Sequence, residues 1–174
     1  MRKALLILAA IPFAASAEVA EEWVVFQKAK LFETQTPMWV KADMEKESVA
    51  EFTARLLDGA RQGDTKSMAT LGRFFFVRGD VGRAAEWLGK AAQAGHAGAQ
   101  LDYGTLRFRG QGVERDLVDS YKWLWLATWA DVPGADAALA ELSSQLQTWE
   151  LLAGLRSAVD YQEAHRKAAK AAKR

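Results

Sequence analysis

The stretch GHAGAQLDYGTLRFRGQGVERDLVDSYKWLWLA, residues 95–127, decides the fold because it repeats the segment that begins at Gly63. Three landmarks recur in both copies: Gly72 with Gly104 at an offset of 32, then Asp80 with Asp116 and Trp87 with Trp123 at an offset of 36. The four additional residues fall in one loop, so the flanking segments keep their register. An internal repeat of this length indicates a stack of similar units that share a continuous core.

Each copy predicts a helical hairpin. The first helix of the first copy is expected from about Thr65 to Arg78, because Met68, Leu71 and Phe75 recur at helical spacing. A glycine inside a helix costs about 1 kcal/mol relative to alanine. Its recurrence at the same point of both copies therefore indicates that two helices approach closely there.

The second helix of each copy is expected to start after an aspartate, Asp80 or Asp116, whose carboxylate can accept from free backbone N–H groups. Gly95 is predicted to close the first unit in the left-handed conformation. The buried stripe of the second helices is expected to comprise Ala84, Trp87, Leu88 and Ala91 in the first copy, and Ser120, Trp123, Leu124 and Ala127 in the second.

These features together resemble the Sel-1-like repeats, which are relatives of the tetratricopeptide repeats. The residues that carry the resemblance are Gly104, Gly110, Gly112, Val113, Asp116 and Trp123. The first copy is degenerate, since Gly79 is the only glycine left before Asp80 in its shortened loop. The resemblance implies an all-α fold, a short right-handed α-solenoid of stacked helical hairpins.

The domain organisation follows from the repeat and its flanks. We expect a signal peptide at 1–17, an N-terminal helix and connection at 18–49, and the repeat domain at 50–174. Within that domain we expect repeats at 63–94 and 95–131, capping helices at 134–166 and a basic tail at 165–174. The upstream segment from Phe52 resembles a second helix alone. The caps are expected as one helix from Gly134 to about Gln147 and another from Thr148 to about Arg166.

The N-terminus is typical of an export signal. Two basic residues precede ten apolar ones, and Ala15 and Ala17 stand where a signal peptidase reads small side chains. Cleavage is therefore predicted after Ala17, which places the protein in the periplasm or outside the cell. A retained membrane anchor is the alternative, but ten apolar residues are too short to span about 30 Å of hydrocarbon.

Charge argues against nucleic acid as a partner. Of the 23 Lys and Arg residues, two lie in the signal, so the remaining 21 face 22 Asp and Glu. A balance so close to zero produces no global field for a polyanion. The segment 18–43 has two open interpretations, a helix and connection docked on the fold, or an arm that orders only with a partner.

Residues with catalytic or metal-binding potential are sparse. The two histidines, His96 and His165, have no second ligand at helical spacing, and the chain has no cysteine. Neither a Gly-x-Ser-x-Gly nucleophile elbow nor a phosphate-binding Gly-x-x-x-x-Gly-Lys loop is present. We therefore expect no catalytic residue, cofactor or metal. The basic C-terminus is either a solvated helix end or a contact for an anionic membrane surface or acidic partner.

The tryptophans of YKWLWLATW, residues 121–129, divide into two faces. Trp123 belongs to the repeated core stripe, whereas Tyr121, Trp125 and Trp129 follow one another at helical spacing on another face. One interpretation is that this second stripe packs on the last helices. The other is that it forms a partner-binding patch, since Trp and Tyr are favoured as anchors at interfaces. We take these three residues as the candidate partner-binding site.

The resemblance implies a function in binding. Stacked hairpins of this family form a curved surface that holds peptides or other proteins, and bacterial members are commonly exported adaptors or regulators. We therefore expect a regulator or adaptor of an envelope complex or sensor. The alternative is a small envelope hydrolase or accessory factor acting on cell-wall, exopolysaccharide or β-lactam substrates. The family members associated with β-lactams carry a cysteine pair in each repeat, which this chain lacks.

Overall fold

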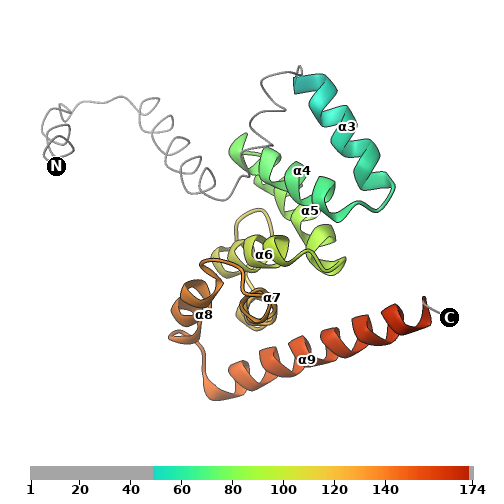
Figure 1. Ribbon diagram of the computed structural model, residues 1–174. Helices are drawn as coiled ribbons and strands as arrows, with labels where there is room; N and C mark the ends of the chain where they lie inside the picture. The colour runs from blue at the N-terminus through green and yellow to red at the C-terminus, as the bar shows by residue number, and fades with distance from the viewer. Residues whose placement is uncertain (1–48, 173–174) are drawn as a thin grey trace, which may run out of the picture.

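The computed structural model describes residues 49–172, and its regular structure there is entirely helical (Figure 1). The seven helices are α3 Val49–Arg61, α4 Thr65–Val77, α5 Val81–Gln93, α6 Ala97–Arg109, α7 Leu117–Trp129, α8 Ala135–Ser143 and α9 Thr148–Ala171. The predicted all-α fold is confirmed. The predicted signal peptide, with Ala15 and Ala17, and the segment 18–48 lie outside the described residues.

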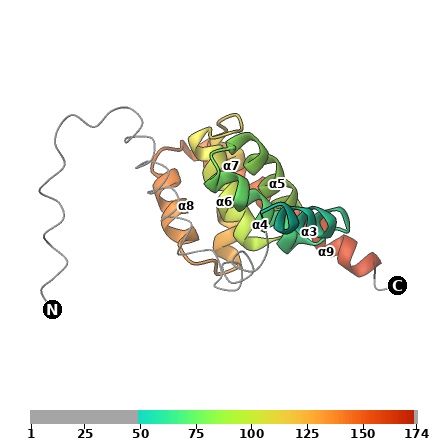
Figure 2. The ribbon, with the colours of Figure 1, turned by 90° about the horizontal axis from the view of Figure 1, so that it is seen from above.

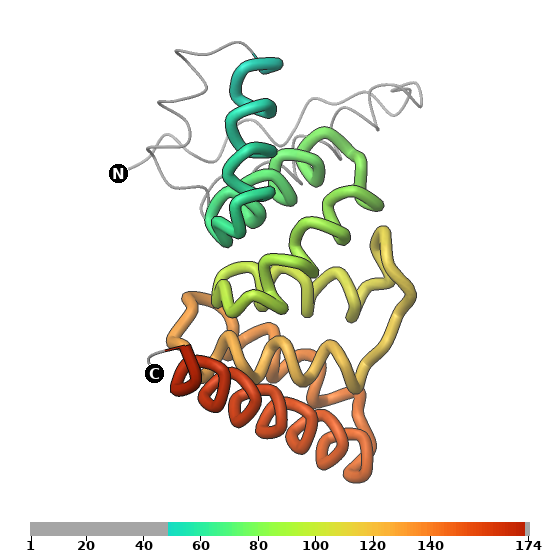
Figure 3. Tube along the Cα trace, turned by 90° about the vertical axis from the view of Figure 1, so that its right-hand side faces the viewer, coloured from blue at the N-terminus to red at the C-terminus, as the bar shows by residue number. Residues whose placement is uncertain are grey.

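Consecutive helices pack against one another from α3 to α8, which produces the solenoid-like stack expected from the repeat (Figure 3). The helices α4 and α5 form the first hairpin, and α6 and α7 form the second. The last helix departs from this order, because α9 packs chiefly against α7 and lies alongside it. As a result α7 is covered by α6, α8 and α9.

The repeated mid-helix glycines lie where helices meet. A Cβ on Gly72 would be 2.6 Å from Cγ and 3.0 Å from the backbone N of Leu88, and one on Gly104 would be 3.0 Å from Cγ of Leu124. The predicted close approach is therefore confirmed in both hairpins. In the second hairpin the buried Ser120 hydroxyl also donates to the Gly104 carbonyl oxygen at 2.7 Å.

The predicted caps are present. Asp80 accepts from the Arg83 backbone N–H at 3.0 Å, and Asp116 accepts from that of Asp119 at 2.9 Å. Gly95 has φ +89°, as its role at the end of α5 requires. Its counterpart after α7 is Asp131, a residue with a side chain held at φ 53°.

The loop glycines pack the second unit onto the first. Gly110 and Gly112 have φ values of +66° and +70°. A Cβ on Gly112 would collide with the carbonyl oxygen of Val81, the first residue of α5. Glycine is required there by both the backbone conformation and the close contact.

Several predicted boundaries were wrong. The helix expected to reach Gln147 ends at Ser143, where the hydroxyls of Ser143 and Ser144 donate to backbone carbonyl oxygens of the preceding turn. The last helix starts as predicted at Thr148, with a capping box between Gln147 and Glu150. It continues to Ala171 instead of Arg166, because the alanines and lysines of the supposed tail are good helix formers.

Smaller corrections concern the start of the fold and one stripe residue. α3 begins at Val49, upstream of the predicted Phe52. Trp87 is half-buried instead of buried, and the Lys90 ammonium lies 4.4 Å from the centre of its ring. The remaining members of the two predicted stripes are buried: Ala84, Leu88, Ala91, Ser120, Trp123, Leu124 and Ala127.

Candidate functional site

Trp123 lies in the core, as the repeat pattern predicts. It is 2% exposed, and its ring meets the edges of two tyrosines, Tyr103 at 5.9 Å and Tyr161 at 5.3 Å between ring centroids. These partners come from α6 and α9. Trp123 therefore joins three helices through one side chain.

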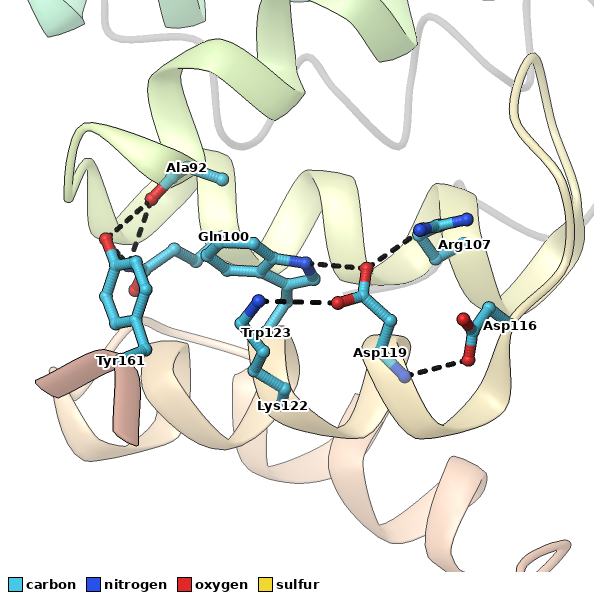
Figure 4. A network of polar contacts seen from close by, with 8 residues as sticks. All are labelled: Ala92, Gln100, Arg107, Asp116, Asp119, Lys122, Trp123 and Tyr161. Carbon is cyan, nitrogen blue, oxygen red and sulfur yellow. Dashed lines mark hydrogen bonds and ion pairs between the residues drawn. The ribbon is translucent and has the colours of Figure 1, made fainter. Parts of the chain in front are cut away.

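A polar network holds the N–H edge of this indole (Figure 4). Asp119 Oδ2 accepts from Trp123 Nε1 and from Arg107 Nε, both at 2.9 Å. The Lys122 ammonium lies 3.4 Å from Asp119 Oδ1 and 3.9 Å from the Trp123 ring centroid. Both carboxylate oxygens of Asp119 thus have partners, one of them on α6 and the others on α7. Asp119 therefore connects the two helices and has a structural role.

Tyr161 connects α9 to the turn between the hairpins (Figure 4). Its hydroxyl lies within donating distance of two carbonyl oxygens at the end of α5, Ala92 at 3.0 Å and Gln93 at 3.1 Å. Burial raises the pKa of this phenol above its ordinary value, and the Gln100 amide opposes that shift. The hydroxyl therefore stays protonated and can donate its hydrogen to these carbonyl oxygens.

The three aromatics predicted as a binding stripe separate in the structure. Tyr121 is half-buried, and a Cβ on Gly154 of α9 would be 2.7 Å from its ring. Trp125 is half-buried against the main core. Trp129 is 68% exposed and stacks on Trp125 at 5.4 Å between centroids and 18° between planes. Only Trp129 presents most of its surface to solvent.

A cavity of about 180 Å³ is lined chiefly by α6, with further residues from α4, α7 and α8. Apolar side chains line much of it, and Arg109 and Glu141 are exposed members of its wall. The lining residues are Phe76, Leu101, Asp102, Thr105, Leu106, Phe108, Arg109, Gln111, Leu124, Gly134, Ala138 and Glu141. A charged residue, Asp102, is thus part of a largely apolar cavity.

Asp102 forms a buried ion pair that joins the two hairpins. Arg73 Nε of α4 donates to Asp102 Oδ2 of α6 at 2.6 Å, and the side chains are only 16% and 5% exposed. Burial raises the pKa of the Asp102 carboxyl, and the Arg73 charge and hydrogen bond partly oppose this. Within residues 49–172 Arg73 is the only partner of this carboxylate, and it bonds only one oxygen. Oδ1 thus retains its capacity to accept.

Sequence reasoning missed this pair. One signal was present, because Arg73 is the single charge in the apolar run LGRFFFV, residues 71–77. A lone charge in a buried stripe requires a partner. The partner lies 29 residues away in the next hairpin, so its identity followed only from the three-dimensional stack.

His96 is a helix cap. Its Nδ1 accepts from the Ala99 backbone N–H at 3.1 Å, a bond that requires this nitrogen to be unprotonated. Burial, followed by the Arg73 charge, lowers the pKa of the ring below its ordinary value. The other histidine, His165, lies on α9 with Nε2 at 3.0 Å from the Gln93 carbonyl oxygen. Residues 49–172 hold no group of three or more His, Asp or Glu that would bind a metal ion.

The remaining observations concern membrane-spanning helices and similarity to known proteins. In the part of the chain that the structure describes, no helix combines the length and the apolarity needed to cross a bilayer. No family model matches this chain, and neither does any curated protein. What the chain itself presents is a cavity with a carboxylate in its wall and a stacked, exposed tryptophan.

Proposed function

We propose that this protein is a helical-repeat binding module that holds a peptide segment of a partner protein, as an adaptor or regulator. The observation that carries the proposal is the cavity at α4, α6 and α8, with Asp102 in its wall. The similarity of the repeat to Sel-1-like units supports the same class of function, because stacked hairpins of that type hold peptides or proteins.

The volume of the cavity favours a side chain over a whole small molecule. Small-molecule sites usually enclose roughly 300–1,000 Å³, whereas this cavity measures about 180 Å³. It is therefore matched to one large side chain. The peptide around that side chain would lie across α6 and α8, beside Arg109 and Glu141.

The chemistry of the wall defines the side chain further. Phe76, Phe108 and Leu124 favour an apolar stem. The free Oδ1 of Asp102 favours an N–H donor at its end, because a desolvated carboxylate gains from each additional donor. Lysine, arginine and glutamine have both features, so we expect one of them at the anchor position of the bound peptide.

The peptide affinities of two variants, each with a substitution at one of two adjacent alanines, test the proposal. Peptides would be selected from a random display library on the purified protein, and their affinity measured by fluorescence anisotropy. Ala138→Trp fills the cavity and is expected to weaken binding at least about tenfold, equivalent to about 1.4 kcal/mol. Ala137→Trp is the matched control, since Ala137 is exposed on the same helix and does not line the cavity.

Equal affinities of the two variants would contradict the proposed site. The thermal unfolding midpoint of each variant shows whether Ala138→Trp remains folded, and a folded variant with lost affinity is the expected result. Incubation with labelled muropeptides and β-lactams provides the second arm. Turnover of either substrate by the purified protein would favour the hydrolase alternative.

The proposed location is the periplasm or the extracellular medium. It is supported by the sequence of residues 1–17, in which Ala15 and Ala17 form the cleavage signature. We predict that N-terminal sequencing of the protein recovered from its native host begins at Glu18. A protein that begins at Met1 and fractionates with the cytoplasm would contradict export.

A further inference from the structure

The outer face of α9 carries a row of exposed side chains that nothing covers among residues 49–172. Trp149, Leu152 and Val159 are 62%, 63% and 41% exposed, although all three are large and apolar. The opposite face of the helix packs on the stack through buried Gly154 and Ala158. With spacings of three and four residues, the complete row is Trp149, Leu152, Arg156, Val159, Glu163, Arg166 and Lys170. These positions form one continuous exposed face of α9, with its apolar residues Trp149, Leu152 and Val159 towards the N-terminal end and its charged residues mostly beyond them.

Among residues 49–172, the last polar contact of α9 with the stack is that of His165, whose Nε2 lies 3.0 Å from the Gln93 carbonyl oxygen. All residues at 163–172 are exposed, and the last turns of α9 stand clear of the other helices (Figure 2). Isolated helical segments shorter than about 12–15 residues are marginal in water. A second helix along these last turns would stabilise them.

When the row is reversed, its central pair of opposite charges matches itself, and its two end residues form a cation–aromatic pair. Arg156 and Glu163 lie on either side of the point between Val159 and Asp160. If a second α9 crosses antiparallel with that point as its centre, Arg156 of each helix faces Glu163 of the other. At the ends, Trp149 of each helix then faces Lys170 of the other. The protein already uses this last contact internally, with Lys122 over Trp123 at 3.9 Å.

We propose that the outer face of α9 is a dimerisation surface that binds the same face of a second copy, antiparallel, across a two-fold axis near Val159. Such an isologous interface requires a self-complementary patch, which the reversed charge order supplies. None of the residues that line the cavity belongs to α9. The dimer would therefore display two independent cavities, and its test is separate from that of peptide binding.

Charge reversal tests the pairing. Sedimentation velocity over a concentration series is expected to show a dimer for the unmodified chain. Arg156→Glu places Glu against Glu twice, and Glu163→Arg places Arg against Arg twice, so each is expected to weaken dimerisation at least about tenfold. The double variant, Arg156→Glu with Glu163→Arg, restores opposite charges and is expected to dimerise as the unmodified chain does. An equimolar mixture of the two single variants is expected to form the heterodimer.

Cysteine crosslinking tests the position of the axis. The chain has no cysteine, so Val159→Cys introduces a unique thiol whose counterpart would lie beside it in the dimer. Mild oxidation is expected to give a disulfide-linked dimer, whereas Asp136→Cys, exposed on α8, is expected to stay monomeric.

Two results would overturn the proposal. One is an unmodified chain that sediments as a monomer at all concentrations. In that case protection of the Val159→Cys thiol from alkylation would indicate that another segment of the same chain covers the face. The other is a dimer that responds identically to the single and double charge reversals, since its interface would then lie elsewhere.

Discussion

Replacing Trp123 with alanine is expected to lower the free energy of unfolding by about 3–5 kcal/mol, as for other buried large aromatics. Its indole is 2% exposed, touches Tyr103 and Tyr161, and donates to Asp119. The substitution removes contacts to α6 and α9 at once and leaves a cavity in the centre of the stack. Urea denaturation followed by circular dichroism measures the loss.

Trp129→Ala is the matched control on the same helix. This tryptophan is 68% exposed, and its one ring contact among residues 49–172 is the stack on Trp125. Its replacement is expected to change the free energy of unfolding by no more than about 0.5 kcal/mol. Similar losses for the two variants would show that the division of the tryptophans into core and surface is incorrect.

Replacing Arg73 with methionine is expected to lower the free energy of unfolding by about 3–5 kcal/mol at neutral pH, because it leaves a buried carboxylate without its partner. Asp102 is only 5% exposed, and Arg73 is its one partner among residues 49–172. Arg83→Met is the comparison, since its ion pair with Asp80 lies at the surface and its loss is expected to leave the urea midpoint nearly unchanged.

The loss caused by Arg73→Met is expected to depend on pH. Burial raises the folded-state pKa of Asp102, and the variant lacks the guanidinium that opposes this rise. A carboxyl with a raised folded-state pKa binds a proton in the native state that the unfolded chain has released, so stability increases as pH falls towards that pKa. The deficit of the variant is therefore expected to be smaller at about pH 5 than at about pH 7.5.

A second substitution distinguishes an unpaired charge from lost packing. Adding Asp102→Leu to Arg73→Met removes the charge as well and is expected to recover most of the loss, since buried ion pairs are often replaceable by apolar residues. A double variant as unstable as the single one, together with a deficit that does not change with pH, would contradict the electrostatic explanation.

The helices and caps were predictable because their signals are local. Asp80, Asp116 and Gly95 act through the backbone groups nearest to them in the chain, so the residue type and its repeat position were sufficient. The mid-helix glycines were predictable for another reason. A costly residue that recurs at one repeat position indicates a contact, and Gly72 and Gly104 do lie against leucines of the second helices.

The candidate site was not predictable because it depends on contacts between repeats. Tyr121 and Trp129 belong to the same sequence stripe, but α9 covers the first and leaves the second exposed. The path of α9 along α7 is not determined by the repeat pattern, which would return it onto α8. The cavity likewise depends on residues from α4, α6, α7 and α8 being brought together, and the repeat pattern does not single out Asp102 among them.

The binding role assigned to the cavity is tested most directly by the affinity of one selected peptide for three variants of the chain. We predict that Ala138→Trp alone loses about tenfold or more in affinity, while Ala137→Trp and Trp129→Ala bind as the unmodified protein does. Lost affinity in Trp129→Ala with unchanged affinity in Ala138→Trp would contradict the account. That result would place the binding site at the stacked tryptophans of α7 instead.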